Sequence, residues 1–237
     1  MRQLYKYQSF NQHSLESVSE NVIWVSKPSD FNDPFEYSFR IDSDMPMQEV
    51  LRRMPDATPE NYLDKQLELI GGIKEEFEIG GVFSLSESNR ISLMWSHYAN
   101  SHYGFCIGYG VENHNHLGNG RCLPVDYGGY KSLGLMEIVK GIEKKDFDFG
   151  KKMYGAMVLS KDPNWKYERE RRILYSQSSQ LITPDFSIKS ITFGLRMKES
   201  HRKILINLMG GKSVCFFQVE KRNDSYDLLP VPFKYDG

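Results

Sequence analysis

Apolar and polar positions alternate with a period of two in many short segments of the chain, the pattern of half-buried β-strands. Most of these segments are rich in β-branched and aromatic residues, which favour strands. We predict strands at residues 4–7, 22–26, 82–86, 104–111, 123–127, 171–176, 190–194, 214–220 and 228–233. The last of these contains prolines, so we expect it at the edge of a sheet.

Helical periodicity occupies much of the sequence between these segments. The predicted helices are residues 14–20, a helix that begins near Thr58 and Pro59, residues 92–99, a long region at 133–159, and residues 199–209. Leu63, Leu67 and Ile70 fall on one face of the second helix, and we expect Gly71-Gly72 to interrupt it. No internal repeat or low-complexity linker divides the chain. The pattern predicts one α+β domain over residues 1–237, with a mixed, mostly antiparallel sheet and flanking helices.

Composition narrows the class of protein. The 237 residues carry 30 basic and 31 acidic side chains, a net charge of −1, which disfavours a polyanion-coating or disordered protein. The N-terminus lacks the features of a signal peptide, and no apolar run approaches the ~20 residues of a membrane span. We therefore expect a cytoplasmic protein without a membrane partner. Its three cysteines fit neither a disulfide framework nor a zinc knuckle.

Residues 93–110, LMWSHYANSHYGFCIGYG, place two histidines and a cysteine close together. A zinc motif favours His at i and i+4 on one helical face, whereas His97, His102 and Cys106 are spaced five and four apart across a predicted helix end. Cys106 lies in an apolar alternation, where an inert buried thiol is commoner than a nucleophile. We expect an interior segment in which His97 hydrogen-bonds to a residue of the functional cleft without binding metal. The expected core residues are Trp95, Tyr98, Phe105 and Ile107.

Four segments pack polar groups among aromatic residues, and such groups need internal partners or a ligand. They are FNDPFE, VFSLSES, MWSHYA with HYGFCIGY, and WKYERERR. Together with LYKY and ITFG, these segments resemble the bacterial family known as domain of unknown function twenty-nine seventy-one. The resemblance implies no settled biochemistry. The family's scattered bacterial occurrence suggests accessory roles such as toxin or anti-phage defence.

The order of segments is also similar to that of ADP-ribosyltransferase folds: a first strand with a basic residue, a Ser-containing strand, and a Glu-x-Glu entering a later strand. This resemblance implies cleavage of the nicotinamide–ribose bond of NAD, which would be a substrate, with no separate cofactor. A fixed carboxylate would stabilise the positive charge that builds on the ribose. Lys6 stands where that fold would have His or Arg. The candidate catalytic residues are Glu170, Glu168 and His97, and the candidate substrate-binding residues are Tyr5, Lys6, Tyr7, Asn32, Asp33, Glu36, Ser84, Ser86, Trp165 and Arg172.

Other interpretations of the same residues remain open. Asp33-Pro34 is a good turn dipeptide, and a charged Glu-x-Glu is often a solvated strand edge. Asp33, Glu168 and Glu170 have the chemistry to hold Mg²⁺ in a nuclease, although arginines rather than a lysine follow them. A non-catalytic module could use Trp165 and Arg172 to bind a nucleotide or a partner protein. The sequence identifies neither a protein nor a nucleic-acid target.

Overall fold

The computed structural model describes residues 3–36, 40–76, 80–111, 116–117, 120–129 and 131–235. The chain forms two compact units, each assembled from separate stretches of sequence. The first unit contains residues 1–26, 81–125 and 164–237, and the second contains residues 27–80 and 126–163. Helices and strands occur together throughout, so the predicted α+β class is confirmed. That the whole chain acts as one domain stays a prediction.

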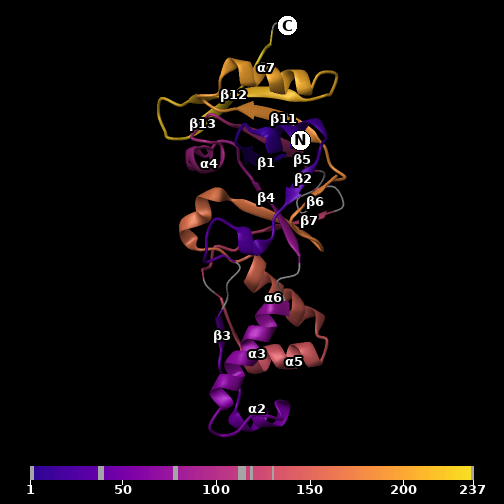
Figure 1. Ribbon diagram of the computed structural model, residues 1–237. Helices are drawn as coiled ribbons and strands as arrows, with labels where there is room; N and C mark the ends of the chain where they lie inside the picture. The colour runs from indigo at the N-terminus through magenta and orange to yellow at the C-terminus, as the bar shows by residue number, and fades with distance from the viewer. Residues whose placement is uncertain are drawn as a thin grey trace. The chain divides into compact units, whose positions relative to one another are not determined.

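Within the residues that the structure describes, a nine-stranded sheet forms the framework of the first unit (Figure 1). Its strands, in spatial order, are β13 (Leu228–Pro232), β12 (Cys215–Lys221), β11 (Ile188–Phe193), β5 (Phe105–Gly110), β1 (Gln3–Gln8), β4 (Gly81–Ser86), β9 (Glu170–Tyr175), β7 (Gly120–Pro124) and β6 (His116–Leu117). The pair β11–β12 is parallel and the other neighbouring pairs are antiparallel. This confirms the mixed, mostly antiparallel sheet that the alternation predicts.

The alternation along β5 separates the two faces of this sheet. Phe105, Ile107 and Tyr109 belong to a core that includes apolar residues of α1 (Gln12–Ser19) and α7 (Glu199–Leu208). Cys106 points the other way, into a second core formed with α4 (Ser92–Tyr98). These two sides are called the α1 face and the α4 face below. In an extended strand neighbouring side chains point to opposite faces, so strand register decides which polar residues meet.

A two-stranded sheet of β2 (Ile23–Val25) and β10 (Gln180–Ile182) completes the first unit, and an isolated bridge joins Ser26 to Val82 of β4. At the far edge of the main sheet, β13 carries Pro230 and Pro232, opposite Val219 and Phe217 of β12. Phe233 N donates to Phe216 O at 2.8 Å, which fixes the orientation of the ladder at this edge. The predicted edge position of this proline-containing strand is confirmed.

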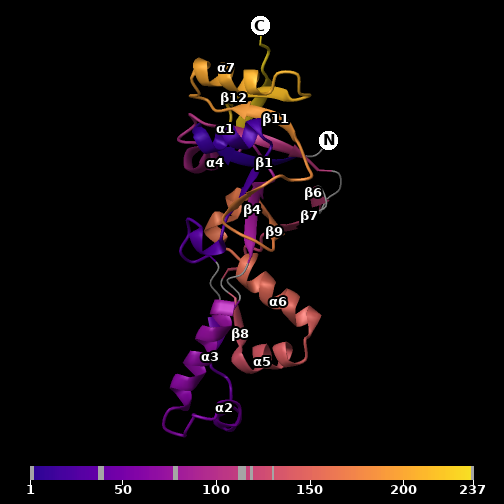
Figure 2. The same ribbon diagram turned by 45° about the vertical axis from the view of Figure 1, so that its right-hand side comes forward.

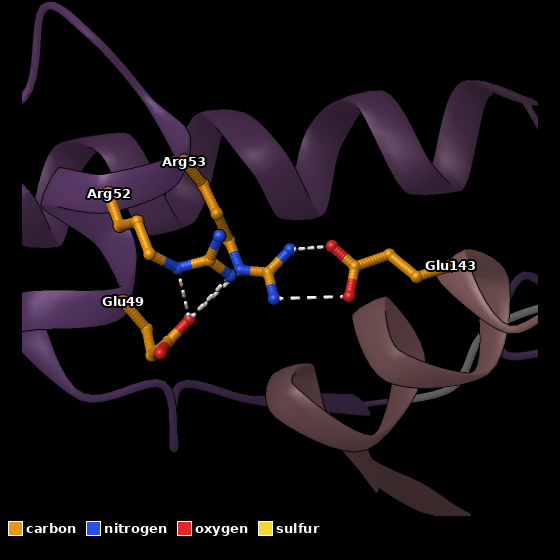
Figure 3. Close-up of polar contacts among 4 residues, drawn as sticks. All are labelled: Glu49, Arg52, Arg53 and Glu143. Carbon is orange, nitrogen blue, oxygen red and sulfur yellow. Dashed lines mark hydrogen bonds and ion pairs between the residues drawn. The ribbon is translucent and has the colours of Figure 1, made fainter.

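The second unit is mainly helical (Figures 1 and 2). It contains η1 (Pro28–Asp30), α2 (Met47–Arg53), α3 (Tyr62–Glu76), α5 (Leu135–Glu143), α6 (Phe147–Val158) and a small parallel pair of β3 (Arg40–Asp42) with β8 (Ser132–Gly134). An ion-pair network connects α2 with α5 (Figure 3). Arg53 contacts Glu143 through both of its terminal nitrogens and Glu49 through Nε at 3.3 Å. Hydrogen bonding to the carboxylates raises the pKa of Arg53.

Three of the predicted element boundaries are wrong. Gly71-Gly72 does not interrupt α3, because open space surrounds both glycines and nothing forces a break there. The long helical region at 133–159 is two helices, separated where Lys145 takes a left-handed conformation (φ 51°) and Asp146 caps the next helix. The strand predicted at 123–127 starts earlier, in β7, and ends at Pro124. Local turn chemistry, rather than hydrophobic periodicity, sets the last two limits.

Candidate functional site

Three adjacent strands bring several of the predicted site residues into one row on the α4 face. Tyr5 of β1 lies opposite Ser86 of β4, and Ser86 lies opposite Glu170 of β9. One step along, Ser84 is paired with Arg172. Residues directly opposite one another in antiparallel strands point to the same face. Residues that the sequence separates by more than 160 positions therefore become neighbours.

Glu170 and Arg172 form a buried, bidentate ion pair within this row. Arg172 Nε donates to Glu170 Oε1 at 2.7 Å, and its terminal nitrogen donates to Oε2 at 2.9 Å. The two side chains are only 7% and 1% exposed. The period of a strand predicts that these residues share a face, and the contact confirms it. Because both charges are shielded from water, the pair holds the Glu170 carboxylate in a fixed position.

Glu168 reaches the same neighbourhood by a different route from the one predicted. It ends the 3-10 helix η2 (Pro163–Glu168), and Arg169 follows in a left-handed conformation (φ 48°) before β9 begins. If the segment were extended from Glu168 onward, the two-residue period would put Glu168 on the same face as Glu170 and Arg172, but the chain is not extended there. Its Oε1 accepts a hydrogen bond of 2.6 Å from Tyr98 OH, and its carbonyl accepts one of 2.6 Å from Ser86 Oγ. A turn rather than strand periodicity positions this buried carboxylate.

A row of aromatic rings lies next to the carboxylates. Ring centroids are 6.0 Å apart between Trp165 and Tyr167, 6.4 Å between Tyr167 and His97, and 6.3 Å between His97 and Tyr98. Trp165, Tyr167 and Tyr98 are half-buried, whereas His97 is exposed. The prediction of an interior His97 is therefore wrong, although Trp95 of the same helix is fully buried as expected. A hydrogen bond from His97 to a site residue stays a prediction.

Lys6 lies between Tyr5 and Tyr7 in sequence but points to the α1 face, because its partner across β5 is Ile107. Its Nζ donates to Ser84 O at 3.0 Å and lies 5.1 Å from the centre of the Phe83 ring. Burial lowers the pKa of Lys6, while the charges of Glu170 and Glu168 work in the opposite direction. The charge of Lys6 therefore interacts with those of Glu168 and Glu170, although its side chain lies on the opposite face of the sheet.

The segment HYANSHYG forms a tight corner between α4 and β5. Asn100, Ser101 and His102 have φ values of 46°, 52° and 72°, a run of left-handed residues without a glycine. At Gly104 any Cβ would lie 2.1 Å from Gln8 O, so a larger residue does not fit. His102 Nε2 lies 3.2 Å from Ser96 Oγ across the corner. Much of this polar motif therefore has a structural role.

The metal and thiol interpretations of this segment gain no support from the geometry. Cys106 is fully buried, and burial raises the pKa of its thiol, so the reactive thiolate is disfavoured. Across the described parts of the chain, no group of three or more His, Cys, Asp or Glu side chains has an arrangement that could hold a metal ion.

The FNDPFE tract belongs to the second unit. Asp33 Oδ1 accepts a hydrogen bond of 2.9 Å from Phe35 N, and Glu36 N donates to Asp33 O at 3.0 Å, so Asp33-Pro34 is the turn that its sequence indicates. Glu36 pairs with Lys161 at 2.8 Å, and both side chains are almost completely buried. Asn32 is exposed. From the sequence we predict that residues 31–36 share one cleft with residues 84–86, His97 and Glu170, and this stays a prediction.

Comparison with known proteins gives a match to a family model. Residues 94–173 match the family model described as Protein of unknown function (DUF2971). The expected family is confirmed over this segment. No curated protein and no solved structure matches the chain, and the resemblance to ADP-ribosyltransferases finds no counterpart in these comparisons.

The DUF2971 segment contains residues 94–98 of α4, all of β5 and residues 168–172, and so includes both carboxylates and Tyr98. The DUF2971 description carries no activity with it. None of the described helices combines the length and apolar character needed to cross a bilayer. A cytoplasmic location stays a prediction.

Two residues that contact the predicted site groups were not among the sequence candidates. Tyr98 was expected only as a core residue, but its hydroxyl binds Glu168. A signal existed, since a tyrosine in a polar helix usually directs its hydroxyl to a partner when its ring is buried. Lys161, the partner of Glu36, stands in an unremarkable SKDP stretch and gave no such signal.

Proposed function

We propose that this protein is an enzyme that cleaves the bond between nicotinamide and ribose in NAD or a related nucleotide, and transfers ADP-ribose to water or to an acceptor. In this reaction the carbon–nitrogen bond breaks and its electron pair leaves with nicotinamide. The acceptor oxygen or nitrogen then bonds to the ribose carbon and loses a proton. The family resemblance adds to the proposal a role as an accessory toxin or in anti-phage defence.

The observation that carries the proposal is the pair of buried carboxylates fixed by neighbouring groups on the α4 face. Tyr98 orients Glu168, and Arg172 orients Glu170. The ribose becomes positively charged as nicotinamide leaves, and a carboxylate that is already in place needs no reorganisation to stabilise that charge. In a site shielded from water this attraction is stronger than in solution. Glu170 is the proposed stabiliser of the ribose charge, and Glu168 the second carboxylate.

The aromatic row supports the choice of substrate. Trp165, Tyr167 and Tyr98 are half-buried and lie beside Glu168 in sequence or through a contact. Planar, electron-poor rings such as nicotinamide stack favourably on aromatic side chains. His97 is exposed within the same row, and its proposed role is to contact the substrate from the solvent side.

The direct experiment incubates the purified full chain with NAD labelled in the nicotinamide or adenine part, with and without cell extract. We expect release of free nicotinamide or appearance of a modified product. Glu168→Gln should reduce turnover by ~100-fold or more, the scale seen when one electrostatic group is removed from a site. Glutamine keeps an oxygen that can accept the Tyr98 hydrogen bond, so this variant tests charge with little change in shape.

Glu170 needs a paired design, because Glu170→Gln alone leaves the Arg172 charge buried without its counter-ion, a change that costs about 3–5 kcal/mol in other buried pairs. Glu170→Gln combined with Arg172→Met removes both charges. Glu220→Gln, at an exposed position of β12, is the control and should leave turnover unchanged. Folding of each variant is checked by circular dichroism.

The alternatives make different predictions in the same assay. A nuclease would leave NAD intact and cleave nucleic acid when Mg²⁺ or Mn²⁺ is added, in a way that depends on Asp33 and Glu170. A binding module would bind a nucleotide without turnover. Either result, with no release of nicotinamide under any condition, would replace the proposed function.

A further inference from the structure

A cavity of about 530 Å³ lies on the α1 face of the sheet, on the side opposite the Glu170 row. Its inner wall combines apolar rings with hydroxyl and amino groups from α1, β1, β2, β4 and β5. Its buried or half-buried wall residues include Lys6, Ser14, Ser17, Ile23, Phe83 and Tyr109. This volume and this mixture of an apolar lining with a few polar groups are typical of small-molecule sites.

The mouth of the cavity exposes two large apolar side chains. Trp24 of β2 is 51% exposed and Leu181 of β10 is 43% exposed. They lie directly opposite each other in the two-stranded sheet and both line the cavity. Neighbouring exposed apolar side chains at the opening of a pocket are a typical feature of a surface that binds an apolar group.

Among the described residues that line the cavity, Lys6 is the one lysine or arginine. Its ammonium group has three donors, and its contacts in the described structure are the Ser84 carbonyl and the Phe83 ring, neither of which is an anion. Burial removes water from the ammonium group and lowers the pKa of Lys6, and the charges of Glu170 and Glu168 act in the opposite direction. A bound anion would offset the cost of that burial. Glu16 at the rim disfavours a multiply charged ligand such as a nucleotide triphosphate.

We propose that this cavity binds a small amphipathic monocarboxylate, with its carboxylate on Lys6 Nζ and its apolar body against Phe83 and Tyr109 toward Trp24 and Leu181. One ammonium group matches one negative charge, and the apolar walls match an aliphatic or aromatic body. The site shares no residue with the carboxylates of the proposed NAD reaction. The proposed ligand site is therefore tested separately from NAD cleavage.

The test is isothermal titration calorimetry of the full chain with decanoate and with decanol, which has the same chain length and no charge. We expect decanoate to bind at least ~10-fold more tightly than decanol, the effect of one charge-assisted hydrogen bond. Lys6→Met should remove this preference while leaving decanol affinity within about two-fold, since the apolar wall is kept. Trp24→Ala should weaken both ligands. Lys198→Met, an exposed lysine on the same unit, is the control.

The proposal is overturned if decanoate binds no more tightly than decanol, or if Lys6→Met keeps the preference for decanoate. It is also overturned if neither ligand binds wild-type protein at a ligand concentration of ~1 mM, which is well above the dissociation constant expected of a formed pocket. Unfolding curves of each variant establish that it is folded. Because Trp24→Ala changes only an exposed side chain at the mouth, it keeps the test decisive even if Lys6→Met fails to fold.

Discussion

At the scale of single residues, Lys6 shows what a strand pattern can and cannot assign. The sequence groups Tyr5, Lys6 and Tyr7 as candidate site residues, but alternate residues of a strand point to opposite faces. Tyr5 joins the Ser86–Glu170 row, whereas Lys6 lines the cavity on the α1 face. That Tyr5 and Lys6 point to opposite faces follows from the sequence once a strand is assigned. The sequence does not show which of the two faces carries the carboxylates, because that depends on the register of β1 with β4 and of β4 with β9.

The buried position of Lys6 predicts a specific dependence of stability on pH. Burial lowers its pKa below the usual 10.5, so between the lowered value and 10.5 the unfolded chain binds more protons than the folded one. Stability therefore rises with pH over this window. We expect Lys6→Met to be more stable than wild type near pH 8 and this advantage to shrink toward pH 10.5.

Urea unfolding of both proteins at the two pH values measures the difference. Tyrosines and other groups that titrate in this range are common to both proteins and cancel in the comparison. An advantage of Lys6→Met that stays constant with pH would show that the lysine charge carries no desolvation cost.

At the scale of elements, the sequence predicts most helices and strands but few of their connections. The alternation of Phe105, Ile107 and Tyr109 gave β5 and its two faces correctly. The corner between α4 and β5 cannot be predicted from periodicity, because three consecutive left-handed residues without glycine are rare and no simple sequence motif indicates them. The same reasoning applies to Glu168, whose place depends on the turn at Arg169 and not on the strand that follows.

The left-handed corner leads to a prediction at Ser101, an exposed residue with φ of 52°. Glycine adopts this conformation without the Cβ penalty, while it loses more backbone entropy on folding. We expect Ser101→Gly to raise the free energy of unfolding by about 0.5–1 kcal/mol. Thermal and urea unfolding provide the measurement.

Ser176→Gly serves as the matched control, because Ser176 is also exposed but does not have a positive φ. It should be neutral or destabilising. If Ser101→Gly behaves like Ser176→Gly, the corner does not carry the expected backbone strain.

At the scale of the whole molecule, the class of fold was predictable and the grouping of segments was not. Hydrophobic periods report local structure, and their sum correctly indicated α+β with a mostly antiparallel sheet. The two compact units are each built from segments far apart in the sequence, such as residues 27–80 and 126–163. No change in amino-acid composition marks the positions where the chain passes from one unit to the other. The candidate site follows the same rule: its residue types were identifiable, but Tyr98 became part of it only through packing.

The outer strand β13 gives a prediction for association between molecules. Phe233 N donates to Phe216 O, so N–H groups at alternate positions along β13 face β12, and those at 230 and 232 would face outward. Both outward positions are prolines, which have no N–H to donate. We expect Pro230→Thr combined with Pro232→Thr to produce concentration-dependent dimers or larger species in light scattering, while wild type shows less. Equal association of both proteins would contradict this role.

These two prolines leave the sheet without donors at the places where another chain would begin to pair. The growth of β-structure from one molecule to the next, the first step toward fibrils, is therefore blocked at this edge. The prolines remove no hydrogen bond between β13 and β12, because the nitrogens at positions 230 and 232 face away from β12.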